Sequence, residues 1–261
     1  MMILPRLELR GIDKAFGPVQ ALSSVNLTAE AGEVTALVGD NGAGKTTLVK
    51  CIGGIHPVDA GQLIFDGTPR TVRGPRDAAA FGVEIVYQDL ALCDNLDIVE
   101  NMFLGREEIT PLRMLDENSM ERLAQRALAS LSVRTVRSVR QLVVSLSGGQ
   151  RQTVAIAKSV LCKSRVVILD EPTAALGVAQ TEQVLDLVRR LAGQGVAVIL
   201  VSHNMNDVMR VADSVGVLYL GRMAAQVRRK EVTQTQVVEL ITAGRSGDLG
   251  LSPAESSGAA V

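Results

Sequence analysis

A glycine-rich turn between an apolar run and a helical pattern is the feature that most limits how this chain can fold. The apolar run is Val34–Val38, and the turn after it, Gly39–Thr46, fits the pattern GxxxxGK[ST]. The glycines let several backbone N–H groups point at one phosphate, and the following helix adds the positive end of its dipole. Lys45 supplies a mobile charge for the β and γ phosphates, and the Thr46 hydroxyl can ligate Mg²⁺. The turn therefore predicts a phosphate site, whereas a simple strand-to-helix turn is the alternative that its flanks disfavour.

Three further apolar runs alternate with helical patterns, which favours an α/β fold around a parallel sheet. The runs are Val166–Leu169, Val196–Val201 and Val215–Leu220, each typical of a strand buried on both faces. Apolar residues recur at helical spacing between them, which predicts helices near 179–193 and 204–212.

The rest of the chain shows different patterns. Looser alternation predicts exposed antiparallel strands at Leu7–Ile12, Val25–Ala29 and Gln62–Phe65. Residues from about 93 to 163 show helical periodicity without a convincing strand, which predicts a helical subdomain inserted into the α/β core. Residues 245–261 are rich in Gly, Ser and Ala and are predicted to form a disordered tail.

The composition excludes several functions. The formal net charge is −1, so the chain has no basic field to hold nucleic acid, and its aromatic residues are only two Tyr and four Phe. Its three Cys form no zinc spacing and are predicted to be small buried hydrophobes. No segment approaches the roughly 18 apolar residues that a transmembrane helix needs. We therefore predict a cytosolic chain that reaches a membrane only through a partner.

An acidic pair follows one of the buried strands. Asp170 and Glu171 come directly after Val166–Leu169, at the end of a strand where α/β sheets place their ligand sites. Asp170 is suited to hold Mg²⁺ through water, and Glu171 is suited to accept a proton from an attacking water. Such a pair alone is a weak signal, but it is strong beside the phosphate loop because Mg²⁺ needs ligands from both sites.

A third motif, Leu146–Gln150, precedes a helical run and lies 20 residues before Asp170. Alone it could be a helix N-cap, with Ser147 capping and the glycines relaxing the turn. Together with the other two motifs, it resembles the ATPase subunit of ABC transporters. The resemblance implies an α/β fold, a P-loop NTPase (RecA-like) core with an antiparallel β subdomain and an inserted α-helical subdomain. It places a single ATPase domain over residues 1–244.

The resemblance also implies roles for individual residues. Phe16 matches the aromatic residue that stacks on adenine, Gln88 matches the glutamine that touches Mg²⁺ and water and links to the transport partner, and His203 matches the histidine that contacts the γ-phosphate. The implied catalytic residues are Glu171, His203 and Gln88. The implied Mg²⁺ ligands are Thr46, Gln88 and Asp170. The implied ATP-binding residues are Phe16, Gly39, Asp40, Asn41, Gly42, Ala43, Gly44, Lys45, Thr46, Thr47, Ser147, Gly148, Gly149 and Gln150.

The chain departs from the family pattern at one position. The family usually has an aspartate four residues after the segment that here reads Asp170–Thr173, and Gly177 stands in its place. Any contact to a second subunit that needs this carboxylate is therefore in question, whereas the base and the metal ligand are kept. Finer features resemble the importers of ribose, xylose and fructose, namely Val86–Leu92, Val99–Glu107 and Ala174–Val178.

These observations predict an ATP-hydrolysing subunit that powers uptake of a small solute, in particular a monosaccharide. ATP and Mg²⁺ are the expected cofactors. The expected partners are a second ATPase copy, an integral membrane permease and, indirectly, a periplasmic solute-binding protein, with no nucleic acid. The subunit would lie peripherally on the cytoplasmic face of the inner membrane. The alternatives are a soluble ATPase of this type that acts on ribosomes or DNA, and a regulatory subunit without hydrolysis, which Glu171 and His203 disfavour.

Overall fold

The computed structural model describes residues 4–133 and 135–245, so the predicted tail, apart from Arg245, lies outside the described residues. The strands are β1 (Leu7–Phe16), β2 (Val19–Ala29), β3 (Val34–Val38), β4 (Ala60–Phe65), β5 (Thr68–Arg70), β6 (Val83–Val86), β7 (Val166–Asp170), β8 (Ala197–Val201), β9 (Ser214–Tyr219) and β10 (Arg222–Arg228). The helices are α1 (Lys45–Ile52), α2 (Pro75–Ala80), α3 (Ile98–Phe103), α4 (Glu117–Ser130), α5 (Gly148–Leu161), α6 (Val178–Gly193), α7 (Met205–Val211) and α8 (Gln234–Ala243), with short 3₁₀ turns at Val143–Ser145 and Arg229–Glu231.

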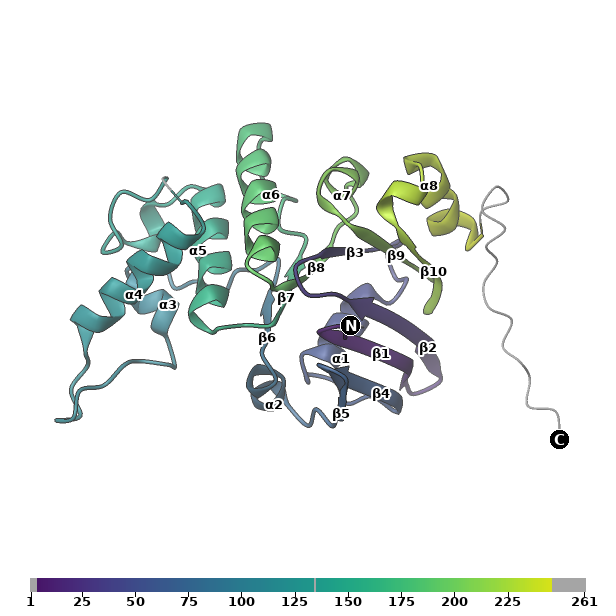
Figure 1. The fold of residues 1–261 in the computed structure, drawn as a ribbon, viewed down its shortest axis with the longest axis horizontal. Coiled ribbons are helices and arrows are strands. Elements are labelled where there is room, and N and C mark those ends of the chain that lie inside the picture. Colours follow the sequence, from purple (N-terminus) through teal and green to yellow (C-terminus); the bar gives the residue numbers. More distant parts are fainter. Residues whose placement is uncertain (1–3, 134, 246–261) are drawn as a thin grey trace.

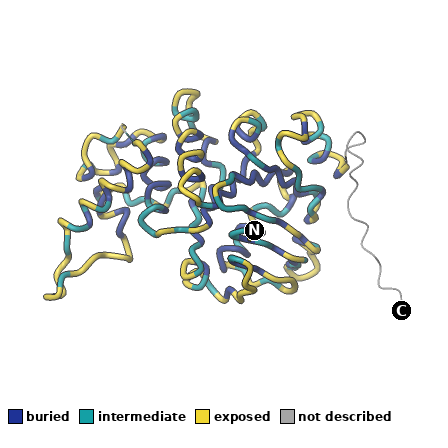
Figure 2. The backbone as a smooth tube through the Cα atoms, viewed as in Figure 1, coloured by how far each residue is buried: buried dark blue, intermediate teal, exposed yellow. Residues whose placement is uncertain are grey.

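A six-stranded sheet with the order β10-β9-β3-β8-β7-β6 forms the centre of the molecule (Figure 1). Strands β9, β3, β8, β7 and β6 run parallel, and β10 pairs with β9 in the antiparallel sense. Helices α6, α7 and α8 lie above this sheet in Figure 1, while α1 and the second sheet lie below it. Every residue of β3 and β8 is buried, and Figure 2 shows buried backbone running through the middle of the molecule, where the central sheet lies. The predicted α/β core is therefore confirmed. The sequence indicated these strands because a strand covered on both faces has a continuous apolar run.

The second sheet has the order β2-β1-β4-β5, and its neighbouring strands are antiparallel. The predicted antiparallel pairing is therefore confirmed, but the prediction that these strands are exposed is wrong for one of the two faces. Leu9 and Ile12 of β1 and Leu27 of β2 are buried and join one cluster with Leu48 and Ile52 of α1. Alternation places every second side chain on the same face, so a strand that looks polar on average still has one apolar face.

The described part of residues 93–163 contains α3, α4, α5 and one 3₁₀ turn, and no strand. These helices lie together at one end of the molecule in Figure 1, beyond α6. Their apolar sides share a cluster with strand residues, which includes Ile98, Leu128, Ile156 and Leu169. None of the helices in the described part of the chain has the length and apolar character needed to cross a bilayer.

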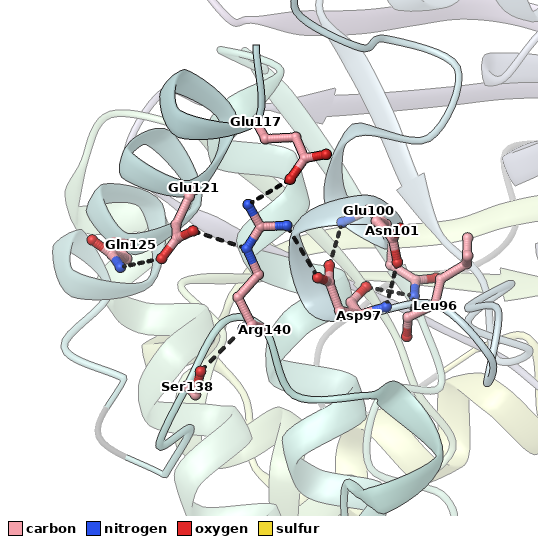
Figure 3. Close-up of polar contacts among 9 residues, drawn as sticks. All are labelled: Leu96, Asp97, Glu100, Asn101, Glu117, Glu121, Gln125, Ser138 and Arg140. Carbon is pink, nitrogen blue, oxygen red and sulfur yellow. Dashed lines mark hydrogen bonds and ion pairs between the residues drawn. The ribbon is translucent and has the colours of Figure 1, made fainter. Parts of the chain in front are cut away.

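Arg140 connects the start of α3 with the first two turns of α4 (Figure 3). Its guanidinium donates to Asp97 at 3.3 Å, to Glu117 at 3.3 Å and to Glu121 at 2.8 Å. Asp97 is the N-cap of α3 and is only 8% exposed; its side chain accepts from the Glu100 N–H at 2.8 Å, and the Glu100 side chain accepts from the Asp97 N–H. The Arg140 guanidinium therefore binds the buried N-cap residue of α3 and two carboxylates of α4 at the same time.

We expect Arg140→Met to lower the free energy of unfolding by about 1 kcal/mol, because the guanidinium is partly exposed but its loss leaves the nearly buried Asp97 without a cation. Urea unfolding followed by circular dichroism measures this change. Arg126→Met on α4 is the matched control, since the described part of the chain shows no carboxylate partner for Arg126. Equal stability of the two variants would contradict a stabilising role for Arg140.

Candidate functional site

Four neighbouring strands of the central sheet end at the same edge, and each is followed there by predicted site residues. The phosphate loop Gly39–Thr46 follows β3, His203 follows β8, Asp170 ends β7 with Glu171 next to it, and Gln88 follows β6. The carboxyl ends of parallel strands lie side by side, and α/β proteins bind their ligands there. The strand order therefore brings together residues that are far apart in the sequence.

A cavity of about 610 Å³ opens at this edge. The predicted site residues that line it are Asn41, Gly42, Gly44, Lys45, Thr46, Thr47, Gln88, Asp170, Glu171 and His203. Its wall also contains residues that the sequence analysis did not select, namely Val19, Gln20, Ala21, Ala174, Val201, Leu220 and Gly221. The predicted site residues outside this lining are Phe16, Gly39, Asp40, Ala43, Ser147, Gly148, Gly149 and Gln150.

The phosphate loop has the conformation that its glycines permit. Gly39 and Gly44 have φ angles of 156° and 103°, and a Cβ at Gly39 would lie 2.3 Å from the Leu218 carbonyl oxygen. No side chain caps α1, because its N-cap is Gly44. The N–H groups of the first helical turn are thus available to a phosphate. Lys45 Nζ donates to the carbonyl oxygens of Gly39 at 2.7 Å and Asp40 at 3.0 Å.

Burial and charge act in opposite directions on the Lys45 ammonium. Its pKa is lowered, first by burial, while the carboxylates of Glu171, Asp40 and Asp170 oppose this shift. The pKa of Asp170 is raised, first by burial and then by the neighbouring Glu171 carboxylate, against the effect of Lys45. Anionic carboxylates and a cation therefore share a partly desolvated site, where each strengthens the charged form of its opposite.

Glu171 lies on the cavity wall in a backbone conformation that is unusual for a residue with a side chain, with a φ of 50°. Its N–H donates to the Val201 carbonyl oxygen at 3.0 Å, which ties β7 to β8 at this edge. His203 Nδ1 lies 2.8 Å from Glu171 Oε2. The structure thus brings together Glu171 and His203, two of the predicted catalytic residues.

The oxygen donors in the cavity fit a magnesium ion. Thr46, Gln88 and Asp170 each supply a side-chain oxygen, and all three residues line the same space. Mg²⁺ prefers such hard oxygen ligands, takes only one or two carboxylates from a protein and completes its shell with phosphate and water. The residues present therefore fit Mg²⁺ bound together with a nucleotide.

The motif at Ser147–Gln150 forms the start of α5. Ser147 is the N-cap, and its hydroxyl accepts from the Gln150 N–H at 3.4 Å while the Gln150 side chain accepts from the Ser147 N–H at 2.9 Å. Gln150 also donates to the Thr135 carbonyl oxygen at 2.6 Å. The capping role that the sequence left open is present, and the motif does not line the cavity of its own chain.

A family model described as ABC transporter matches residues 22–174 of this chain. The chain belongs to the ABC transporter family. It is 41% identical to the fructose import ATP-binding protein FrcA of Rhizobium meliloti, over 92% of this ABC chain and 95% of that protein. It is 40% identical to the xylose/arabinose import ATP-binding protein XylG of Sulfolobus acidocaldarius, over 94% of this chain and 97% of that protein. The ribose import ATP-binding protein RbsA of Chromobacterium violaceum is 39% identical over 93% of this chain, which spans about half of that longer protein (48%).

Solved structures support the same fold. The ABC chain is similar to cbiO1 of Clostridium perfringens, part of the transporter complex cbiONQ, with a TM-score of 0.76, 26% identity and coverage of 95% of this chain and 99% of that one. It is also similar in fold to a nucleotide-free ATP-binding cassette from an ABC transporter, with a TM-score of 0.75, 24% identity and coverage of 86% and 92%. The predicted P-loop NTPase core is therefore confirmed.

Phe16 comes shortly before Val19 in the sequence, but unlike Val19 it does not line the cavity. Its ring meets the His56 ring edge-on, with centroids 5.1 Å apart, and Lys14 Nζ lies 5.5 Å from the Phe16 centroid. The ring is 43% exposed, so it is not a core residue. His56 lies between α1 and β4, whereas Phe16 ends β1, so no local sequence pattern indicates this ring contact.

Gly177, which stands where the family usually has an aspartate, affects the start of α6. It is the N-cap of α6 in the extended conformation with a φ of −72°, and no side chain caps this helix. A Cβ at Gly177 would meet nothing within 4 Å. An aspartate at this position would therefore fit and would accept from the N–H groups of the first turn.

We expect Gly177→Asp to raise the free energy of unfolding by a few tenths of a kcal/mol, because aspartate caps a helix slightly better than glycine. Guanidinium unfolding at equilibrium measures the difference. Gly177→Ala, which adds a Cβ without a cap, is the matched control and should not stabilise the chain. A stability of Gly177→Asp at or below that of Gly177→Ala would contradict the capping argument.

Proposed function

We propose that this ABC chain is the ATP-hydrolysing subunit of an import system that carries a monosaccharide through a membrane permease. The observation that carries the proposal is the cavity in which the phosphate loop, Asp170, Glu171 and His203 meet on neighbouring strands. The names of the relatives support the solute class, since they import fructose, xylose or arabinose, and ribose. We propose residues 1–244 as one ATPase domain with a helical insertion over about 93–163.

In the proposed mechanism, the phosphate loop N–H groups and Lys45 hold the β and γ phosphates of ATP. The Glu171 carboxylate accepts a hydrogen bond from the attacking water and takes its proton, while His203 holds this carboxylate by the 2.8 Å contact and reaches the γ-phosphate. Thr46, Gln88 and Asp170 would hold Mg²⁺, which when bound neutralises phosphate charge. Catalysis is then mainly positioning and electrostatic stabilisation.

A second copy of the chain is part of the proposal. Ser147–Gln150 do not line the cavity of their own chain, although Gly148 and Gly149 begin a helix whose first N–H groups could bind phosphate. A head-to-tail dimer would place this motif of one chain over the Lys45 site of the other. Phe16 would stack on the adenine ring at the outer end of the site.

The remaining partners are also proposed. The permease would contact this chain near Gln88 and the helical insertion, and a periplasmic solute-binding protein would act through the permease. The chain would then lie peripherally on the cytoplasmic face of the inner membrane. An ATPase that acts on ribosomes or DNA is the second candidate, and the net charge of −1 gives it no support.

Sugar uptake tests the proposed function. Cells that lack this gene should lose uptake of at least one of the radiolabelled sugars fructose, xylose, arabinose and ribose, and the wild-type gene should restore it. The Glu171→Gln gene should express the chain without restoring uptake. Unchanged uptake of all four sugars would contradict monosaccharide import, and co-sedimentation of the chain with ribosomes would favour the second candidate.

A further inference from the structure

The two segments that carry Glu171 and His203 are joined by a second contact that lies inside the protein. Thr173 follows Glu171 by two residues, and Asp207 follows His203 by four, in the first turn of α7. Thr173 Oγ1 donates to Asp207 Oδ2 at 2.6 Å. Thr173 is 8% exposed and Asp207 is 5% exposed, so water does not compete freely for this hydrogen bond.

The contact between Glu171 and His203, which joins the same two segments nearer the solvent and is the outer contact, is weak by comparison. The His203 side chain is 67% exposed, and solvent-exposed polar pairs contribute little because water and salt screen them. Glu171 also has a φ of 50°, a conformation that a residue with a side chain keeps only when its surroundings fix it. The bond from the Glu171 N–H to the Val201 carbonyl oxygen holds the start of this turn, and a contact other than that to His203 must hold the residues after it.

The buried hydrogen bond has the properties needed for this task. If either partner were removed, the other polar group would remain buried without a partner, which costs more than the bond itself gains. A second cavity, of about 390 Å³, is lined by Glu171, Thr173, His203 and Asp207 together, so the outer and the inner contact border one space. The N-cap of α7 is Asn204, directly after His203, and its side chain accepts from the Asn206 N–H at 3.0 Å. The helix start that carries Asp207 therefore also fixes the backbone beside His203.

We propose that Thr173 and Asp207 are positioning residues that hold the Glu171–His203 pair in its reactive geometry. The Thr173 hydroxyl anchors the turn after β7 to α7, and neither residue touches the nucleotide cavity. This inference rests on the proposed ATPase function. It predicts that the buried bond affects the chemical step and leaves ATP binding alone, because the phosphate loop follows a different strand, β3.

Thr173→Val tests the proposal, since valine has nearly the same shape without the hydroxyl. We expect kcat for ATP hydrolysis to fall about 10- to 100-fold with KM for ATP unchanged, because small misplacements of catalytic groups have effects of this size. Thr173→Ser should restore kcat. The purified 261-residue chain is assayed at a concentration so high that the wild-type rate per chain no longer depends on the protein concentration.

A double-mutant cycle shows whether the bond itself matters. Asp207→Ala should reduce kcat as Thr173→Val does, and the double variant should lose no more than either single variant. Thr35→Val is the matched control, because it removes another buried side-chain bond, in which the Ser214 hydroxyl donates to Thr35 at 3.1 Å. Thr35→Val should lose a similar amount of stability in urea unfolding and keep its kcat.

The outcomes separate this proposal from the proposed function. A wild-type kcat in Thr173→Val, an equal loss in Thr173→Ser, or an equal loss in Thr35→Val would each overturn the positioning role. A rise in KM for ATP without a fall in kcat would overturn it as well. Glu171→Gln, assayed in parallel, reports on the proposed function: if it hydrolyses ATP normally, the catalytic assignment itself fails.

Discussion

Glu171→Gln is expected to bind ATP like the wild type and to hydrolyse it about 10²–10⁴-fold more slowly, which is the usual effect of losing one general base. Glutamine keeps the shape of the side chain but cannot accept a proton from the attacking water. The substitution also replaces a carboxylate that lies 2.8 Å from His203 Nδ1 by a neutral amide. Removal of one negative charge from a site that must hold ATP favours nucleotide binding, so affinity should not fall.

Phosphate release at saturating ATP measures the rate, and a fluorescent ATP analogue measures affinity. Glu108→Gln is the matched control, because Glu108 is exposed in the loop between α3 and α4 and lies outside the cavity. It should hydrolyse ATP at the wild-type rate. Near-normal turnover by Glu171→Gln would exclude Glu171 as the base.

Lys45→Met is expected to weaken ATP binding about 10- to 100-fold, which corresponds to the loss of one or two hydrogen bonds to a charged group. Lys45 is the cation of the phosphate loop, and its ammonium already donates to the carbonyl oxygens of Gly39 and Asp40. In the variant the Gly39 carbonyl oxygen loses the Lys45 donor, the Asp40 oxygen keeps only the Ala43 N–H, and the carboxylates of Glu171 and Asp170 lose a neighbouring positive charge. Both effects oppose the entry of an anionic nucleotide.

Calorimetric titration with ATP and Mg²⁺ measures the Lys45→Met affinity. Lys158→Met is the control, since Lys158 is a lysine near the end of α5 and lies outside the cavity lining. The control should bind ATP as the wild type does, and both variants should unfold at the wild-type denaturant concentration. Wild-type affinity in Lys45→Met would show that the loop does not bind the phosphates.

The sequence was a good guide to the buried strands and a poor one to the periphery. Val34–Val38 was predicted with the observed bounds, because a strand covered on both faces needs apolar side chains throughout. β10 was missed, since Arg222–Arg228 has a mixed pattern and becomes a strand by pairing with β9. α8 was missed although Thr233 and Gln236 form a capping box that the spacing of the two residues could have revealed.

The site residues also divide into those that local sequence patterns indicate and those that they do not. Residues that end a buried strand, such as Asp170, were predicted because local patterns place them. The other wall of the cavity comes from β2 and the turn between β9 and β10, which meet the phosphate loop through long-range contacts. The Gly221 N–H donates to the Ala43 carbonyl oxygen at 3.0 Å, and the Ser23 N–H donates to the Gly221 carbonyl oxygen at 2.8 Å. No local pattern indicates such contacts, so Gln20 and Leu220 could not be predicted.

The position of β3 in the central sheet has a consequence for how the protein is made. β3 carries the phosphate loop, yet its two partners in the sheet, β8 and β9, begin only at Ala197 and Ser214. During translation, the complete phosphate-loop sequence therefore leaves the ribosome long before β8 and β9, which pair with β3, have been synthesised. Unpaired apolar strands such as β3 are liable to aggregate until their neighbours arrive. We expect the nascent chain to gain nucleotide affinity only after β8 and β9 have been synthesised, so that ATP binding reports on the completion of the central sheet around β3.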